Sequence, residues 1–383
     1  MFIAPRIKKI YPVYQIANNI FRIGAQIGIT SQIKDVDNKM KSLVDLMDGR
    51  PLGTIVEKML SKYPALVKED IIKAIKRLDQ AGFVEESGDI QQIKPRYRSN
   101  VYYFSRYLND FNKSINIQRK INQSNILLLG LGGGGANILT LLAGLGPKKL
   151  KIVDFDRVEL SNLGRQFLYK ESDIGKLKVE VAKNTLQQMN SDIEVEAFNL
   201  KISTYHDLAP LLSDIDLAIC VIDEPQFIIH RIVNKAMVEY DIPFVFGASQ
   251  VSRGRVYSVI PHVTGCFDCL NIHYMKQDDQ FIQQFIGLRD SSKPIPTIAY
   301  GPSIFQLTAA ITDEAMRLLT GYAQPMSLNK QFEINYETGA SFTHQPWGRY
   351  PKECPTCGKG KEENWEIFSN YQQEVSAKND KRT

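Results

Sequence analysis

The feature that most constrains the fold is a short apolar strand that runs into a cluster of glycines. Residues 125–137 read NILLLGLGGGGAN, in which Gly130, Gly132, Gly133 and Gly135 fit the pattern G-x-G-G-x-G. Such glycines allow a tight turn and a close approach of phosphate, and the helix that follows presents its N-terminal amides to phosphate oxygens. We therefore expect a strand, a phosphate-binding loop and a helix. The glycines alone do not distinguish a nicotinamide dinucleotide from an ATP that is consumed.

The segments after this loop alternate between strand and helix patterns. Apolar runs at 149–156, 193–200, 217–223 and 243–249 predict strands, and 176–189 predicts a helix. Alternation of this kind indicates an α/β fold with a doubly wound, mostly parallel, Rossmann-like sheet. Ligands of such sheets bind beyond the carboxyl ends of the strands.

The N-terminal part of the chain has another pattern. Short β-rich segments at 11–33 precede three helix-like segments at 37–47, 52–61 and 67–80, which a strand-like FVEE follows. Strands, three helices and a wing predict a small winged-helix-like domain. The predicted divisions are 1–95 for this domain, 96–370 for the α/β domain and 371–383 for a flexible, charged tail.

Composition excludes several classes of protein. With 43% hydrophobic residues, the chain of 383 residues can build a core, yet no apolar run is long enough to cross a bilayer. The lysine-bearing N-terminus lacks the pattern of a secretory signal, so we expect a cytoplasmic protein without a membrane partner. A net charge of +5 is too mild to indicate nucleic acid.

Charged side chains downstream of the loop favour ATP. Asp154 ends the second strand about 20 residues after the loop, where a carboxylate can accept ribose hydroxyls in either nucleotide. Attack on the α-phosphorus of a triphosphate also needs fixed cations and a carboxylate that holds a metal. Arg165, Lys178 and Asp223 supply that set. Taken singly, each is also typical of a solvated surface.

In this order the motifs resemble those of the ThiF/MoeB/HesA family, which is related to the adenylation domains of ubiquitin-activating enzymes. GLGGGGAN, IVDFDRVELSNLGRQF, GKLK, VIDEP, GCFDC and CPTCG carry the resemblance over about residues 96–358. It implies an α/β fold, usually a homodimer, that uses Mg-ATP to adenylate a carboxylate and releases pyrophosphate. It further implies that Asp154 binds ribose, that Asp156 lies near the nucleotide and that Asp223 holds magnesium.

The same resemblance assigns the side chains that contact phosphate. Asn162, Arg165 and Lys178 match positions that meet the phosphates. The family often carries an arginine before the first strand that reaches the ATP of the partner subunit. In this chain the aligned residue is Ser99, with Arg98 beside it as the candidate replacement.

Four of the five cysteines form two C-x-x-C pairs, Cys266 with Cys269 and Cys354 with Cys357. Two such pairs predict a closed, four-thiolate structural zinc site that fastens the C-terminal region to the sheet. A disulfide is less favoured in a cytosolic protein, and a redox pair is the remaining alternative. Cys220 lies in an apolar run and is expected in the core.

Within the family the chain resembles the peptide-modifying branch, similar to the microcin C and pantocin A maturation enzymes, through QPMSLNKQ at 324–331. The domain at 1–95 resembles PqqD-like domains, which bind a leader peptide as an added strand. DNA binding is disfavoured because the third helix mixes acidic and basic residues. A purely structural dimerisation arm is the other alternative.

The segment 271–300 resembles a loop that crosses over the sheet near the substrate, where His273 and Arg289 are either substrate contacts or surface residues. No cysteine lies between Cys269 and Cys354, the stretch in which thioester-forming relatives carry theirs. The reaction is therefore expected to stop at an acyl-adenylate, which an internal or amide nucleophile captures.

Three hypotheses follow for the function. The first is adenylation of a carboxylate of a ribosomally synthesised precursor peptide, ending in cyclisation or in a phosphoramidate. The second keeps the adenylation but assigns the Gly-Gly terminus of a ubiquitin-like sulfur carrier. The third is a peptide-binding scaffold without catalysis, which the presence of Arg165, Lys178 and Asp223 disfavours.

Overall fold

The computed structural model describes residues 1–224, 228–278, 298–344 and 346–365, together with Gln280, Phe281, Gln283, Gly287 and Phe368. The chain divides into two compact units, Met1–Lys120 and Ile121–Thr383. This division lies within helix α5 (Phe111–Gln123) and not at residue 95. Helix α4 (Arg98–Ser105) and the start of α5 share a buried cluster with Ile93, so α4 and most of α5 belong to the first unit. The predicted tail at 371–383 lies outside the described residues.

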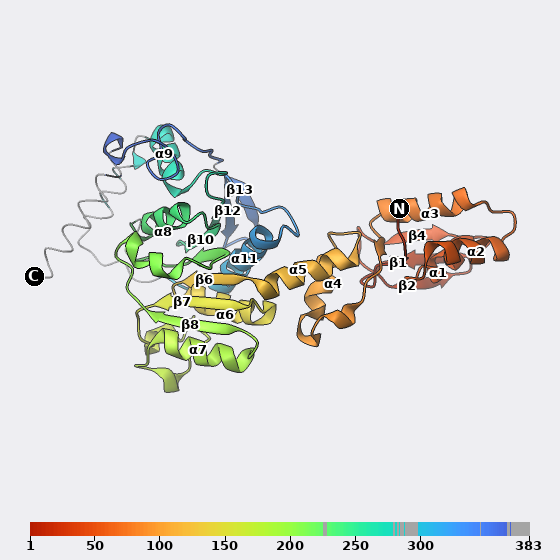
Figure 1. Cartoon of the computed structure of the whole chain (residues 1–383), viewed down its shortest axis with the longest axis horizontal. Helices are drawn as coiled ribbons and strands as arrows, with labels where there is room; N and C mark the ends of the chain where they lie inside the picture. Colours follow the sequence, from red (N-terminus) through yellow and green to blue (C-terminus); the bar gives the residue numbers. More distant parts are fainter. Residues whose placement is uncertain are drawn as a thin grey trace, which may run out of the picture. The chain divides into compact units, whose positions relative to one another are not determined.

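One eight-stranded sheet forms the second unit, in the order β13-β12-β11-β10-β9-β6-β7-β8 (Figure 1). Its strands are β6 (Asn125–Leu129), β7 (Lys149–Asp154), β8 (Glu194–Asn199), β9 (Leu217–Cys220), β10 (Phe244–Ser249), β11 (Arg253–Val259), β12 (Gln331–Asn335) and β13 (Ser341–His344). The strands from β10 to β8 are parallel, and β11 to β13 add an antiparallel extension. The predicted α/β class with a mostly parallel sheet is confirmed.

Helices cover both faces of this sheet. They are α6 (Gly133–Leu145), α7 (Lys178–Met189), α8 (Ile228–Glu239), α9 (Phe267–Gln277) and α11 (Gly301–Thr320). Helix α6 packs with α11, and α8 packs with α9. Burial on both faces explains why the central strands are continuous apolar runs, such as the ILLL of β6.

The order of the strands places a topological switch point at β6. From β6 the chain builds β7 and β8 on one side, and then β9 and β10 on the other. Leu129 and Cys220 are paired at the carboxyl ends of β6 and β9, so the loops after the two strands begin side by side. In open α/β sheets the crevice at such a point is where ligands bind.

The antiparallel extension was not predicted from the sequence. Strand β12 carries Gln331 and Glu333, both buried, and β13 is only four residues long. Polar residues at buried positions remove the apolar alternation by which a half-buried strand is recognised. The predicted parallel strands, in contrast, are all present, with ends that agree or are shifted by up to three residues.

The part of the first unit that precedes α4 contains two small antiparallel sheets and three α-helices. Its elements are β1 (Pro5–Ile7), β2 (Val13–Ala17), β3 (Ile20–Ile23), β4 (Ser31–Lys34), α1 (Lys39–Leu46), α2 (Leu52–Lys62), α3 (Lys68–Gln80) and β5 (Val84–Glu86). Strands β2, β3 and β4 form one sheet. The sequence FVEE supplies β5, which pairs with β1 near the start of the chain. Buried side chains such as Phe21, Leu43, Ile55 and Ile71 join the sheets and helices in one core.

Across the described ranges, no helix combines the length and the apolar character that are needed to cross a membrane. The winged-helix-like character of the first unit stays a prediction, as do the functions assigned to the two parts of the chain.

Candidate nucleotide site and cysteine centre

The glycine loop lies between β6 and α6, and two of its glycines are required by the fold. Gly130 has φ +93°, a conformation that other residues rarely adopt. A Cβ atom added to Gly135 would overlap the carbonyl oxygen of Gly130. At Gly133, in contrast, an added Cβ would lie 3.4 Å from Cγ of Arg165, an ordinary van der Waals distance. Gly130 and Gly135 therefore shape the turn, whereas Gly133 leaves room beside Arg165.

Helix α6 begins directly in this loop. Its N-cap is Gly132, and no described side chain caps the helix. Ala136 donates its N–H to the carbonyl of Gly132 over 3.0 Å, but the amides of the first turn have no carbonyl of the helix to bind. Such amides, with the positive end of the helix dipole, are suited to phosphate oxygens.

Asp154 braces the loop from the end of β7. Its Oδ2 accepts the N–H of Leu131 over 2.6 Å, and its Oδ1 accepts the N–H of Asp156 over 2.8 Å. Burial raises the pKa of the carboxyl group, while these hydrogen bonds and the charge of Lys178 oppose the rise. Each oxygen keeps a further lone pair with which a ribose hydroxyl could be accepted. The binding of ribose by Asp154 stays a prediction.

Lys178 is the first residue of α7, and its side chain is buried at the same edge of the sheet. Its Nζ lies 2.9 Å from Oδ2 of Asp156, and its N–H donates to the carbonyl of Asp156 over 3.0 Å. A buried ammonium group needs such a partner. The structure thus joins two residues whose predicted roles concern the same nucleotide, and the half-exposed Asp156 keeps the ammonium charge near the loop.

Arg165 and Asn162 lie on the turn that faces the glycine loop. Arg165 donates from Nη1 to the carbonyl of Ser161 over 3.1 Å, and its aliphatic part lies beside Gly133. Asn162 is buried, and its Oδ1 accepts the N–H of Glu159 over 3.1 Å. In this structure Asn162 therefore stabilises its own turn, while Arg165 lies at the loop.

Asp223 follows β9, the neighbour of β6. Val221 donates its N–H to the carbonyl of Leu129 over 3.0 Å, and its side chain lies against the loop glycines. The side chain of Ile222 lies against Gly130. These contacts bring the exposed Asp223 to the edge of the sheet at which the glycine loop lies. A carboxylate there is a suitable ligand for Mg²⁺.

Two buried side chains that the sequence did not single out support these loops. Tyr169 donates its hydroxyl to the carbonyl of Leu131 over 2.9 Å, and burial raises the pKa of its phenol. Nε2 of His230, on α8, lies 3.2 Å from the carbonyl oxygen of Ile222, and burial lowers the pKa of the imidazole to about 4. A neutral imidazole therefore donates a hydrogen bond to the turn that carries Asp223. Both residues lie in apolar stretches, which resemble ordinary core.

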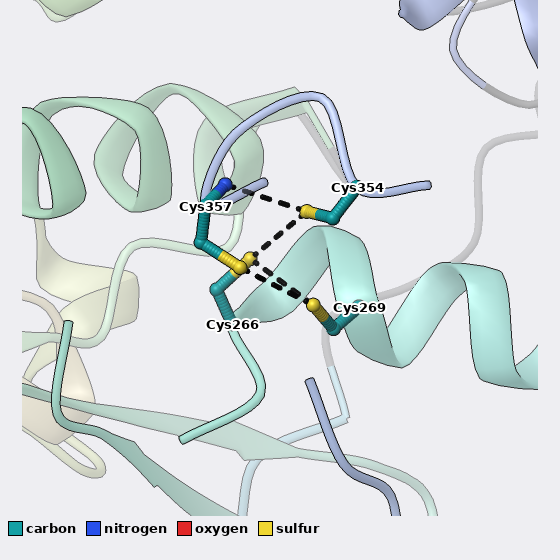
Figure 2. Close-up of side chains that lie close together, drawn as sticks. All are labelled: Cys266, Cys269, Cys354 and Cys357. Carbon is teal, nitrogen blue, oxygen red and sulfur yellow. Dashed lines mark hydrogen bonds between the residues drawn. The ribbon is translucent and has the colours of Figure 1, made fainter. Parts of the chain in front are cut away.

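The four paired cysteines form a single buried cluster. Figure 2 shows Cys266 and Cys269 at the start of α9 and Cys354 and Cys357 on a later loop, with their sulfur atoms turned toward one another. The Sγ atom of Cys266 lies 3.9 Å from that of Cys269 and 3.5 Å from that of Cys354, and the Sγ atoms of Cys269 and Cys357 are 3.4 Å apart. Zinc–thiolate bonds of about 2.3 Å in a tetrahedron require sulfur atoms roughly 3.8 Å apart. The residues therefore fit the predicted structural zinc ion.

A buried polar network connects the two cysteine pairs to α8. Asp268, between the first two cysteines, accepts the hydroxyl of Thr356, between the last two, over 2.6 Å. It also pairs with Nε of Arg231 over 3.2 Å, and Nη2 of Arg231 lies 2.6 Å from Glu362. Asp268 is completely buried. The network joins both cysteine pairs to the helix that also carries His230.

The remaining predicted residues have partners in other segments or lie outside the described residues. Arg98 donates to the carbonyl of Ile93 and to Gln91 within the first unit. Nδ1 of His273 lies 3.4 Å from the hydroxyl of Tyr350. Arg289 and most of the predicted crossover loop after α9 are outside the described residues. Cys220 is fully buried in β9, and burial raises the pKa of its thiol to about 12.

Comparison with known proteins agrees with this arrangement. A model of the ThiF family matches residues 104–356. The sulfur carrier protein adenylyltransferase of Thermus thermophilus is 30% identical over 247 residues, which is 63% of this chain and 84% of the relative. The sulfur carrier protein ThiS adenylyltransferase of Bacillus subtilis is 29% identical over 251 residues, covering 63% of this chain and 67% of the relative.

Similar solved structures extend further along the chain. The microcin C7 biosynthetic enzyme MccB, from E. coli, matches with a TM-score of 0.74 and 22% identity. The match covers 93% of this chain and 100% of the other. Structures of that enzyme have been solved with AMPCPP and with MccA. At this identity the likeness concerns the fold.

Proposed function

The chain belongs to the ThiF family and is an ATP-dependent adenylyltransferase, and on that premise we propose that it adenylates a carboxylate of a ribosomally synthesised precursor peptide. An oxygen of that carboxylate attacks the α-phosphorus of ATP, and the bond between the α- and β-phosphates breaks. Pyrophosphate leaves with the electron pair, and an acyl-adenylate is formed. An internal or amide nucleophile then attacks the acyl carbon and displaces AMP, which gives a cyclised product. A phosphoramidate needs one more step, in which a nitrogen of the peptide attacks the α-phosphorus of a second ATP, loses its proton and displaces a second pyrophosphate.

The residues at the carboxyl edge of the sheet have the chemistry that this step needs. The open amides of α6 and the guanidinium of Arg165 would bind phosphate oxygens. Lys178 would add a second positive charge at the same edge, held by Asp156. Asp223 would hold magnesium, which neutralises charge on the phosphates when it is bound. Asp154 would orient the ribose from beneath the loop.

One observation favours a peptide over a protein carrier. The likeness to the two sulfur carrier adenylyltransferases covers 63% of the chain, whereas the likeness to MccB covers 93%. The first unit, Met1–Lys120, is a compact unit of its own, and the ThiF match begins only at residue 104. A module of this size in addition to the adenylation fold supports recognition of a peptide. The sulfur carrier remains the second candidate, because the curated relatives act on one.

The first unit offers a place for a leader peptide. Strand β4 is at the edge of its sheet and pairs only with β3 among the described residues. Its residues alternate between half-buried and exposed, so one face can hold side chains while the open edge hydrogen-bonds to an added strand. We expect a Gln32→Pro variant, which removes an N–H at this strand, to bind the precursor more weakly than a Gln32→Ala control.

The second unit also supports a homodimer. Phe155, Leu160, Phe167 and Phe305 are large apolar side chains that remain exposed, and the rings of Phe167 and Phe305 stack with their centroids 5.3 Å apart. A stacked pair of exposed aromatic rings, such as Phe167 and Phe305, is the kind of apolar surface that an interface buries. A Phe167→Asp variant that sediments as a monomer, while the original chain sediments as a dimer, would support this assignment; identical sedimentation would remove it.

Peptide-dependent exchange of pyrophosphate into ATP tests the proposed function. We expect exchange with a precursor peptide that has a free carboxylate, and its loss on Asp223→Ala. A Glu224→Ala variant is the matched control, because Glu224 is an exposed neighbour on the same turn. Exchange with a Gly-Gly-tailed carrier alone would instead favour the second candidate. Absence of exchange with both substrates would favour the scaffold that lacks catalysis.

A further inference from the structure

Five polar side chains gather on the antiparallel extension of the sheet, at a distance from the glycine loop. They are Arg253 and Arg255 of β11, Gln331 and Glu333 of β12, and Tyr274 of α9, here termed the arginine cluster. The adjoining part of this face is packed with aromatic rings. A polar cluster beside an apolar face requires an explanation, because polar groups that lose water cost free energy unless they are paired.

The two arginines point to the face opposite α11. Residues of a strand alternate between its two faces. On β11, a Cβ added to Gly254 would meet Leu307 of α11, and the hydroxyl of Ser258 donates to Glu314 of α11 over 3.0 Å. Arg253 and Arg255 are out of step with these residues and therefore lie on the face of α9.

The charges of the arginine cluster do not balance. Glu333 is fully buried and pairs with Nη1 of Arg253 over 3.1 Å and with Nε of Arg255 over 2.6 Å. One carboxylate neutralises one guanidinium, so a net positive charge remains. The side chains of Arg253 and Arg255 are still 42% and 30% exposed. Each guanidinium also carries more N–H donors than its share of one carboxylate can accept.

The buried Gln331 of the cluster has a hydrogen-bond acceptor that no described residue uses. Gln331 is buried and donates from Nε2 to the hydroxyl of Tyr274 over 2.5 Å. Its Oε1 is buried and has no hydrogen-bond partner among the described residues. Burial raises the pKa of the Tyr274 phenol, and the nearby charge of Arg255 opposes the rise. The cluster therefore has hydrogen-bonding capacity beyond a closed ion pair.

Strand register places the arginine cluster near the proposed reaction site. Arg255 pairs with Ala248 of β10, and Phe246 of β10 pairs with Cys220 of β9. Three residues after Cys220 comes Asp223, and two residues after Phe246 comes Ala248. Strand β11 is two strand spacings, about 10 Å, from β9. This is the distance across the sheet between Arg255 and the turn after β9 that carries Asp223. An extended peptide covers this distance in about three residues.

We propose that the arginine cluster is a substrate subsite that binds a second carboxylate of the peptide, about three residues from the carboxylate that is activated. The inference rests on the proposed function and specifies its substrate as a peptide with two nearby carboxylates. A guanidinium binds a carboxylate through two parallel N–H groups, which fixes the direction of the chain as well as its charge. The second carboxylate is an acidic side chain or the C-terminus.

Pyrophosphate exchange with short synthetic peptides tests this subsite in the full chain. Each peptide carries one invariant carboxylate and a Glu at a varied position, with matched Gln peptides and C-terminal amides. We expect a Glu peptide with the correct spacing to exceed its Gln counterpart in kcat/KM by roughly tenfold to a hundredfold. No loss on Glu→Gln at any position, together with a loss on C-terminal amidation, would identify the C-terminus as the bound carboxylate.

The variant Arg253→Gln should remove most of this discrimination, and Arg253→Lys should keep part of it. The control is Lys276→Gln on α9, because the Lys276 side chain is 40% exposed and also pairs with a carboxylate, that of Glu353. An unchanged discrimination in Arg253→Gln, or none in the original chain, would overturn the subsite alone. Absence of exchange with every peptide would overturn the proposed function, and the subsite with it.

Discussion

The buried His230 gives a quantitative prediction about stability and pH. Its ring lies against Phe246 and Phe267, with centroids 4.8 and 5.5 Å away, and its Nε2 bonds to the carbonyl of Ile222. Burial lowers its pKa from 6.5 to about 4. Below pH 6.5 His230 is therefore protonated in the unfolded chain but stays neutral in the folded chain. The free energy of unfolding falls as the pH falls toward 4.

The size of the effect follows from the shift. A pKa unit corresponds to about 1.4 kcal/mol, so the full shift corresponds to about 3 kcal/mol, reached only near pH 4. The pH interval from 7.0 to 5.5 avoids exposing the cysteine centre to strong acid. Over this interval we expect the free energy of unfolding to fall by roughly 1 kcal/mol because of His230. A His230→Gln variant keeps a hydrogen-bond donor but has no such titration, so its free energy of unfolding should lack this component.

Urea denaturation gives the free energy of unfolding of both proteins at pH 7.0 and at pH 5.5. The change between the two pH values in the original chain, minus the same change in His230→Gln, is the contribution of His230. The other titrating groups are common to both proteins and cancel. If His230→Gln loses as much stability as the original chain over this interval, the imidazole is not buried in the neutral state and the reasoning is wrong. A His230→Leu variant, which cannot donate to Ile222, should in addition raise the KM for Mg-ATP more than His230→Gln does.

Three further changes have clear expected results. Gly135→Ala should lower the melting temperature because its Cβ overlaps the loop carbonyl, whereas Gly133→Ala should fold normally and bind ATP less well; equal melting temperatures would contradict this. Tyr169→Phe should cost about 1 kcal/mol of stability in urea titration through its lost hydrogen bond. Cys354→Ser should lose bound zinc by elemental analysis, whereas Cys220→Ser should retain it; unaltered zinc content in Cys354→Ser would refute the four-thiolate site.

The sequence predicted the parts of the fold that rest on local signals. The continuous apolar run of β6 is typical of a buried strand, and the spacing of the glycines after it is typical of a tight turn into a helix. The two C-x-x-C pairs were likewise sufficient to predict the cysteine cluster, because each pair supplies two ligands from one turn. Asp154 and Asp223 could be placed at one edge because parallel strands end together.

Contacts between distant segments were beyond such reasoning. Glu333 is buried in β12, where Arg253 and Arg255 of another strand pair with it, and neither arginine is near it in sequence. Asp268 lies between two cysteines of the cluster, and its partners Arg231 and Thr356 come from other segments. Long-range pairing of this kind leaves no periodic signal, so the antiparallel extension and the arginine cluster were not predicted.

The central claim is that the edge formed by the glycine loop, Arg165, Lys178 and Asp223 activates a peptide carboxylate with ATP. Exchange of labelled pyrophosphate into ATP, measured with a precursor peptide and with its fully amidated form, tests this most directly. We predict exchange only with the free carboxylate, lost in Arg165→Ala and retained in a Lys201→Ala control, whose lysine lies on the loop after β8. Exchange that ignores amidation, or that survives Arg165→Ala unchanged, would contradict the claim.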